Sequence, residues 1–71
     1  MKYVVVYEKS GTGRAAYAPD LPGVVTTGQT RAEARSLIQR AIQFHLDGRK
    51  EDPLPIPEPS AEAEVISVSH R

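Results

Sequence analysis

Short runs of apolar residues, separated by glycine and proline, fill the first 30 positions of the chain. The run at 2–8 is β-branched and aromatic and contains no helix former before its end, which is typical of a strand. Shorter runs at 14–18, which contains alanine and Tyr17, and at 24–28, which is β-branched, follow glycine- and proline-containing turns. The N-terminal part of the chain therefore predicts three short strands in consecutive order.

Both faces of the first predicted strand are apolar. Alternation places Tyr3, Val5 and Tyr7 on one face and two valines on the other. Because one helix covers only one face of a sheet, we expect this strand to be central and one of its faces to meet another molecule. The predicted oligomer interface consists of Tyr3, Val5 and Tyr7, with Tyr17 from the second strand.

A helical period begins after position 30 and predicts a helix at 31–47. Thr30 and Glu33 have the spacing of a capping box, in which the threonine accepts a hydrogen bond from the amide at position 33. Gly48 is predicted to end the helix. The apolar stripe that would pack on the sheet consists of Ala34, Leu37, Ile38, Ala41, Ile42 and His45.

Proline occupies every second position from 53 to 59, within the segment 49–62. This spacing excludes helix formation and pairing in a β-ladder, and it favours an extended, stiff segment. We call residues 49–62 the strap. The β-rich run at 64–69 predicts a fourth strand. The expected fold is thus α+β, with the order βββαβ in one domain that spans 1–71.

Composition limits the classes of function. The 71 residues include nine basic and nine acidic side chains, so the net charge is zero, and this argues against bulk binding to nucleic acid. Without cysteine and with only two histidines, neither a disulfide framework nor a structural metal site is expected. No signal peptide or membrane span is visible, so a cytoplasmic protein is predicted.

Chain length points to self-association. A chain this short buries only about 60% of the surface that its unfolded form exposes, so its core is thin. Oligomerisation is the remaining means of reinforcing the fold, since disulfides and metals are excluded. We expect a dimer or a tetramer.

Few side chains are candidates for chemistry. Asp20 lies on a predicted loop, but such a carboxylate usually accepts local amide hydrogen bonds and stabilises a turn. Arg31, Arg35 and Arg40 could form a basic strip on the exposed helix face, although acidic residues interrupt it. His45 lies in the apolar stripe, where a packed histidine is the simpler interpretation. No catalytic set, metal site or cofactor is predicted, and the chain is interpreted as a binding module.

Three motifs, in their order along the chain, carry a resemblance to a known family. The motif "PDLPG" (19–23), the helix start "T-x-x-E-A" (30–34) and "PIPEPS" (55–60) follow one another at the spacing of the HicB-like antitoxin family. The chain resembles the N-terminal domain of these type II toxin–antitoxin proteins over roughly residues 2–68. The resemblance implies a partial ribonuclease-H-like fold, in which a mixed four-stranded sheet carries one helix on one face.

The resemblance also implies a function. Such domains bind and occlude a small basic HicA-type toxin that cleaves messenger RNA. The expected partner-binding residues are Asp20, Leu21, Pro22, Gly23, Arg31 and Arg35. Full-length members continue into a DNA-binding domain, which this sequence does not contain, so direct DNA binding is not expected. The alternative is a stand-alone oligomeric regulatory module that binds RNA or a small ligand.

Overall fold

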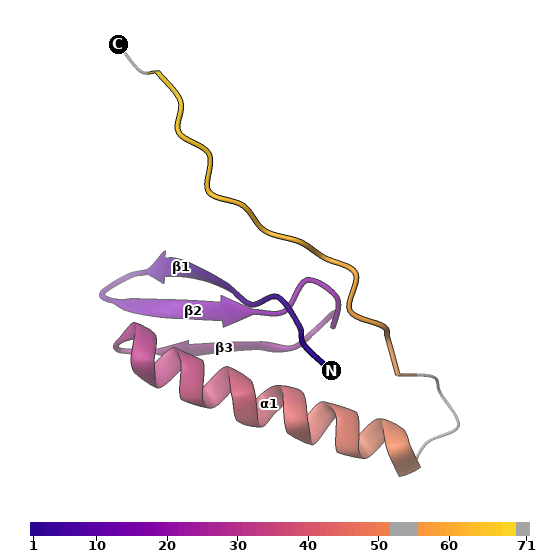
Figure 1. The fold of residues 1–71 in the computed structure, drawn as a ribbon. Coiled ribbons are helices and arrows are strands. Elements are labelled where there is room, and N and C mark those ends of the chain that lie inside the picture. Colours follow the sequence, from indigo (N-terminus) through magenta and orange to yellow (C-terminus); the bar gives the residue numbers. More distant parts are fainter. Residues whose placement is uncertain (52–55, 70–71) are drawn as a thin grey trace.

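Three antiparallel strands and one helix make up the fold (Figure 1). The computed structural model describes residues 1–51 and 56–69. The elements are β1 (Val6–Ser10), β2 (Gly13–Tyr17), β3 (Val25–Gly28) and α1 (Arg31–Glu51). The strands follow one another across the sheet in the order β1-β2-β3, and α1 packs on one face. The prediction of an α+β fold with three consecutive strands and one helix is confirmed.

A tight hairpin joins β1 to β2. Ser10 pairs with Gly13, which leaves Gly11 and Thr12 as the loop. Gly11 has a φ of 61°, whereas Thr12 does not have a positive φ. This combination is the pattern of a type II′ turn, whose twist matches that of the flanking strands. The glycine-containing turn that the sequence predicts before the second strand is therefore a two-residue loop.

Two overlapping β-turns form the loop between β2 and β3. The amide of Leu21 donates to the Ala18 carbonyl at 3.0 Å, and the amide of Val24 donates to the Leu21 carbonyl at 3.1 Å. Each turn has proline at its second position, where a φ near −65° is required. In the second turn Gly23 has a φ of 85°, as a type II turn needs. The motif "PDLPG" is thus a compact double turn.

The register of the sheet determines which side chains face the helix. Tyr7 lies opposite Ala16, and Ala16 lies opposite Thr26. Because Ala16 is fully buried, this row belongs to the face that α1 covers. The neighbouring row of Val6, Tyr17 and Val25 lies on the helix-free face. The core between sheet and helix consists of Ala16, Ala18, Leu21, Val24, Ala34 and Ile38.

Local hydrogen bonds explain where α1 begins. The Glu33 amide donates to the Thr30 hydroxyl at 3.1 Å, as the capping box predicts. The Glu33 carboxylate accepts from the Gln29 amide at 3.4 Å, one residue before the amide that a standard box uses. The predicted helix start is confirmed.

The predicted helix end is wrong. α1 continues through Gly48 to Glu51, and Gly48 does not have the positive φ of a glycine cap. The residue before a proline is steered away from helical geometry, and Asp52 precedes Pro53 in the sequence. Proline 53 was therefore the better signal for the end of the helix. Residues 52–55 of the predicted strap lie outside the described part of the chain.

The structure does not form the predicted fourth strand. Residues 56–69 are extended and belong to neither helix nor strand, and 62–69 are exposed throughout. A strand requires a neighbouring edge, and Figure 1 shows this segment running away from the sheet. Consequently β1 is an edge strand within the described chain, not the central strand that its apolar faces suggested.

Candidate protein-binding surfaces

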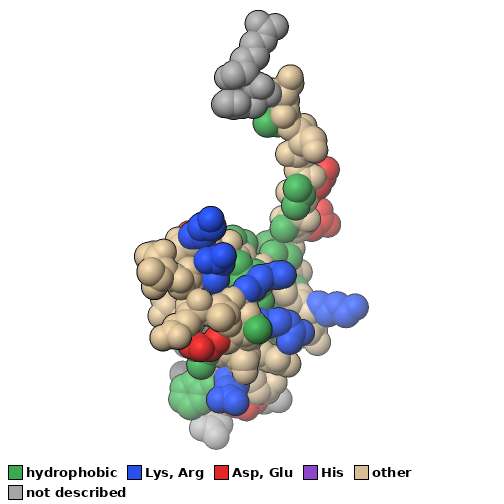
Figure 2. Space-filling view, turned by 90° about the vertical axis from the view of Figure 1, so that its left-hand side faces the viewer, with side chains coloured by type: hydrophobic (Ala, Val, Ile, Leu, Met, Phe, Trp, Pro, Cys, Tyr) green, Lys and Arg blue, Asp and Glu red, His purple; other side chains and the backbone are tan. Residues whose placement is uncertain are grey.

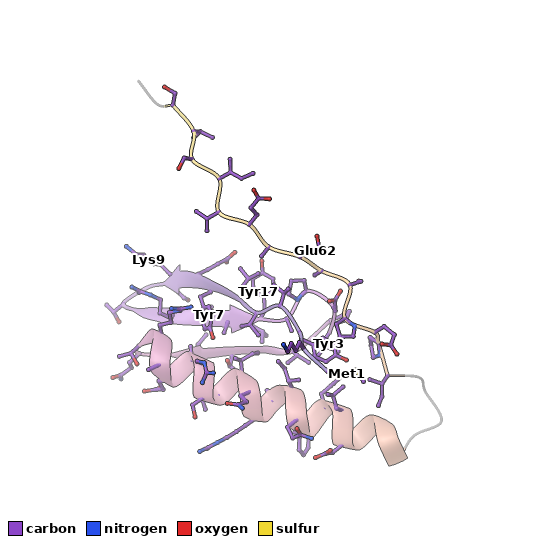
Figure 3. All side chains as sticks on the ribbon, viewed as in Figure 1. Met1, Tyr3, Tyr7, Lys9, Tyr17 and Glu62 are labelled. Atoms are coloured by element: carbon purple, nitrogen blue, oxygen red, sulfur yellow. The ribbon has the colours of Figure 1, made fainter. Side chains whose placement is uncertain are left out.

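An apolar groove lies between β1 and α1. Because α1 packs mainly against β2 and β3, the start of the chain overhangs the helix and leaves a hollow of about 570 Å³. Its wall residues from the N-terminal segment and α1 are Tyr3, Val5, Tyr7, Ile38, Ile42 and Leu46. Tyr3, labelled in Figure 3, thus lines the same hollow as Ile42 and Leu46 of α1.

Polar side chains form the outer rim of this groove. Arg35, Gln39 and Gln43 also line it, and their spacing of four residues places them along one ridge of α1. An apolar floor with a polar rim is the composition of a site that holds an apolar segment of a protein.

Basic side chains gather at the end of the molecule where α1 begins. Lys9 and Arg14 lie directly opposite each other in the β1–β2 ladder, on the face that α1 covers. The Arg31 guanidinium carbon lies 4.6 Å from the centre of the Tyr7 ring, within the range of a cation–π contact. Figure 2, which views this end, shows the concentration of Lys and Arg side chains. Like charges directly opposite each other repel, so this end of the molecule favours an anion.

Asp20 binds the strap that follows α1. One carboxylate oxygen accepts the amides of Ser60 and Ala61, each at 2.9 Å, and the other accepts the Ser60 hydroxyl at 2.9 Å. The backbone amide of Ala61, followed by that of Ser60, lowers the pKa of Asp20 below its ordinary value of 3.8. The sequence suggested that Asp20 stabilises its own turn. Its hydrogen bonds instead reach a segment 40 residues further along the chain.

A second contact holds the strap near the N-terminus. The hydroxyl of Tyr3 donates to the carbonyl of Pro57. Ile56 lines the end of the groove beside this bond. The strap is thus attached at both Tyr3 and Asp20, which are at the same end of the sheet.

The residues predicted to bind a partner do not form one surface. The double turn lies at the end of the sheet where β2 finishes, whereas Arg31 begins α1 at the opposite end. Leu21 is 1% exposed and belongs to the core, because the two turns direct it inward. Pro22 and Gly23 are exposed at the tip of the loop, and Arg35 lines the groove.

The predicted oligomer residues are likewise divided between two faces. Tyr3, Val5 and Tyr7 pack against the core on the helix side. Tyr17 lies on the opposite face, in the row with Val6 and Val25. The structure therefore offers two separate apolar surfaces where the sequence suggested one.

Phe44 is an exposed aromatic that the sequence analysis did not identify. It lies on α1 and is 82% exposed, so the domain's own packing does not explain it. Arg40 precedes it by one helical turn on the same side. Phe44 is the only phenylalanine in the chain, and it lies outside the apolar stripe that is predicted to pack on the sheet. A large apolar side chain at a position predicted to face solvent is the sequence feature that could have identified it.

The described residues provide no assembly for metal-dependent chemistry. Among residues 1–51 and 56–69, no three His, Asp or Glu side chains come close enough to hold a metal ion. His45 is half-buried on α1. Within the same ranges, no helix is both long and apolar enough to cross a membrane.

Comparison with known proteins identifies a matching family and similar individual proteins. Residues 3–70 match the model of the "HicB_like antitoxin of bacterial toxin-antitoxin system" family. The chain is 41% identical over 66 residues to Antitoxin HicB 2 of Photorhabdus laumondii, which covers 93% of this chain and 48% of that protein. It is 37% identical over 57 residues to a 14.9 kDa protein from the rep-hol intergenic region of Haemophilus phage HP1, covering 80% and 43% of the two chains. No solved structure matches the chain.

The extent of these matches decides the assignment. The family model covers almost every residue, from the start of the apolar N-terminal segment to the extended tail. The chain spans about half the length of the curated relatives it matches. It belongs to the HicB-like antitoxin family of bacterial toxin–antitoxin systems.

Proposed function

We propose that this domain is the toxin-binding part of an antitoxin, and that it occludes a small basic HicA-type toxin that cleaves messenger RNA. The observation that carries the proposal is the match to the antitoxin family over residues 3–70. The fold agrees with a binding role, since its surfaces offer apolar and basic contacts. The domain would then act by covering the toxin and not by catalysis.

Phe44 is the side chain that we assign to the centre of the toxin contact. Aromatic and arginine side chains supply much of the binding energy at protein interfaces, and Phe44 lies next to Arg40 on the solvent side of α1. An exposed phenylalanine gains by transfer from water into a partner's pocket. The remaining polar residues of this helix face would form the surrounding rim.

The test uses a small basic protein encoded beside the gene of this chain. Its expression is expected to arrest growth of a bacterial host, and co-expression of this domain is expected to restore growth. The purified pair should form a complex that the Phe44→Asp variant weakens by about 30-fold or more, as expected for loss of an interface hot spot. Ala63→Asp is the matched control, since it adds the same charge at an exposed position outside α1.

Two results would contradict the proposal. If no neighbouring product arrests growth or co-purifies with the domain, the toxin-binding role is wrong. If a complex forms but Phe44→Asp binds as tightly as Ala63→Asp, the role stands and the assignment of Phe44 is wrong.

A second candidate function rests on the basic end of the molecule. Arg31 lies over the Tyr7 ring there, and Lys9 and Arg14 lie opposite each other in the adjoining β1–β2 ladder. Phosphate groups bind such clusters and nucleotide bases stack on aromatic rings. We therefore retain RNA binding by a stand-alone regulatory module as the alternative.

A further inference from the structure

We propose that residues 64–69 of one copy add as a strand to the free edge of β1 in a second copy, and that the exchange is reciprocal. The site would be a joint one, because each copy supplies an edge with its groove and also the strand that fills it. The proposal concerns self-assembly and does not depend on the identity or presence of a toxin.

The first observation is the exposed edge of β1. In the described chain β1 has a strand on one side only, so its other side presents unpaired amide and carbonyl groups. The groove of about 570 Å³ opens directly beneath this edge. A strand added to β1 would send every second side chain into that groove.

The second observation is the exposure of residues 64–69, which we call the tail. Val65 is 98% exposed, Ile66 69% and Val68 81%, although these β-branched residues favour a half-buried sheet. Figure 2 shows this segment projecting from the body with hydrophobic side chains along it. The tail therefore has the sequence of a strand but lacks a neighbouring strand within its own described chain.

Length and alternation show that the tail and the edge are complementary. Six residues of strand span about 20 Å, and the five residues of β1 span about 17 Å. In an added strand, Ile66 and Val68 would share one face and Val65 would point to the other. The side chains of Ile66 and Val68 would enter the groove beside Tyr7. The side chain of Val65 would cover Val6 on the helix-free face.

The attachment of the strap favours a second copy over the same chain. The Asp20 carboxylate holds Ser60 and Ala61 at the loop that follows β2. From this point the chain leaves the sheet (Figure 1), and in Figure 3 the strap passes Glu62 and continues outward. A segment that projects from its own body is placed to reach a neighbour, and a twofold exchange satisfies both tails at once.

The first experiment measures the dimer in solution by light scattering across a concentration series. Wild type is expected to be dimeric at micromolar concentration. Ile66→Asp should raise the dimer dissociation constant by about tenfold or more, because the exchange would bury its carboxylate in an apolar groove. Ser67→Asp carries the same charge on the other face of the tail and should leave the dimer intact. The helical circular dichroism of both variants should match that of wild type, since both positions are exposed.

The second experiment locates the tail directly. The chain has no cysteine, so Glu8→Cys and Ser67→Cys can be introduced in two differently tagged copies and joined by a short bismaleimide. After unfolding and refolding of the mixture, we expect a cross-link between the two tags. Ser36→Cys replaces Glu8→Cys in the control, and this pair should not cross-link.

Three results would overturn the exchange. The first is a monomer at all concentrations. The second is the absence of a cross-link between the two tags while a single chain that carries both Glu8→Cys and Ser67→Cys cross-links internally, which would place the strand on its own β1. The third is a dimer that Val25→Asp dissociates and Ile66→Asp does not, which would indicate packing through the helix-free faces.

Discussion

At the scale of single residues, Asp20 joins parts of the chain that are far apart in sequence. Its three hydrogen bonds lie at the surface, where each contributes little on its own. Their effect is mainly directional, because they determine where the strap leaves the body. An ionised carboxylate can accept all three, whereas an alanine at this position can accept none.

We expect Asp20→Ala to release the strap at neutral pH. The amides of Ser60 and Ala61 should exchange with solvent faster in the variant, as measured by NMR. Glu58→Ala, which removes an exposed carboxylate from the strap, is the control and should not alter these amides. Equal exchange in wild type and Asp20→Ala would show that Asp20 does not hold the strap.

The same contact determines a pH dependence. Because hydrogen bonds lower the folded-state pKa of Asp20 below 3.8, its stabilising contribution is present above that value and is lost as the pH falls through the folded-state pKa. Wild-type exchange at Ser60 and Ala61 should therefore approach that of Asp20→Ala only under strongly acidic conditions. Release of the strap near neutral pH would contradict this sign.

At the scale of elements, the glycines have different roles. Gly28 is packed so closely against the start of α1 that an added Cβ would lie 2.8 Å from the Ala34 amide nitrogen. Gly48 lies inside the helix, and apart from its chain neighbours and the helix's own backbone no atom comes within 4 Å of such a Cβ. Only the first glycine is needed for packing, and the second carries the entropic cost of glycine in a helix.

Gly48→Ala is therefore expected to stabilise the protein by about 0.5–1 kcal/mol. The free energy of unfolding can be measured by urea denaturation monitored at a helical wavelength. Gly28→Ala is the opposing control and should destabilise by about 1–3 kcal/mol, because backbone atoms must move to admit the methyl group. A destabilised Gly48→Ala would mean that Gly48 ends the helix in solution.

At the scale of the whole molecule, charge and apolar surface are unevenly distributed. The net charge is zero, yet Figure 2 shows one end that is rich in Lys and Arg. Apolar surface remains in the groove, at Phe44 and along the tail. The molecule measures 52 × 26 × 16 Å, an elongated shape for a chain of 71 residues. Such exposed surface is typical of a protein that functions in an assembly.

The basic end makes RNA binding testable. If the alternative function holds, single-stranded RNA should bind at low salt and lose affinity as salt rises. Lys9→Ala with Arg31→Ala should lower the slope of log affinity against log salt by about 0.7 for each lost phosphate contact. Arg40→Ala lies away from this end and is the control. Failure to retain RNA at low salt would exclude this alternative.

The sequence by itself determined the local elements. The β-branched runs, the prolines and glycines of the double turn and the capping box at Thr30 act over a few residues, so their outcome can be derived from neighbouring positions. The two apolar faces of the first strand were also visible, and the family motifs led to the assignment that the relatives confirm. Gly48 predicts an earlier helix end than the structure has, because a glycine ends a helix only where it adopts a positive φ, and Gly48 does not.

Tertiary structure alone decided how these elements meet. Strand pairing and burial depend on residues far apart in the chain, and for this reason Leu21 proved to be core and β1 proved to be an edge. The hydrogen bonds that Ser60 and Ala61 donate to Asp20 could not be derived from spacing, since the donors lie 40 and 41 residues beyond the acceptor. The run at 64–69 has strand propensity, but a strand forms only beside another strand, and the path of the strap directs this run away from the sheet of its own chain.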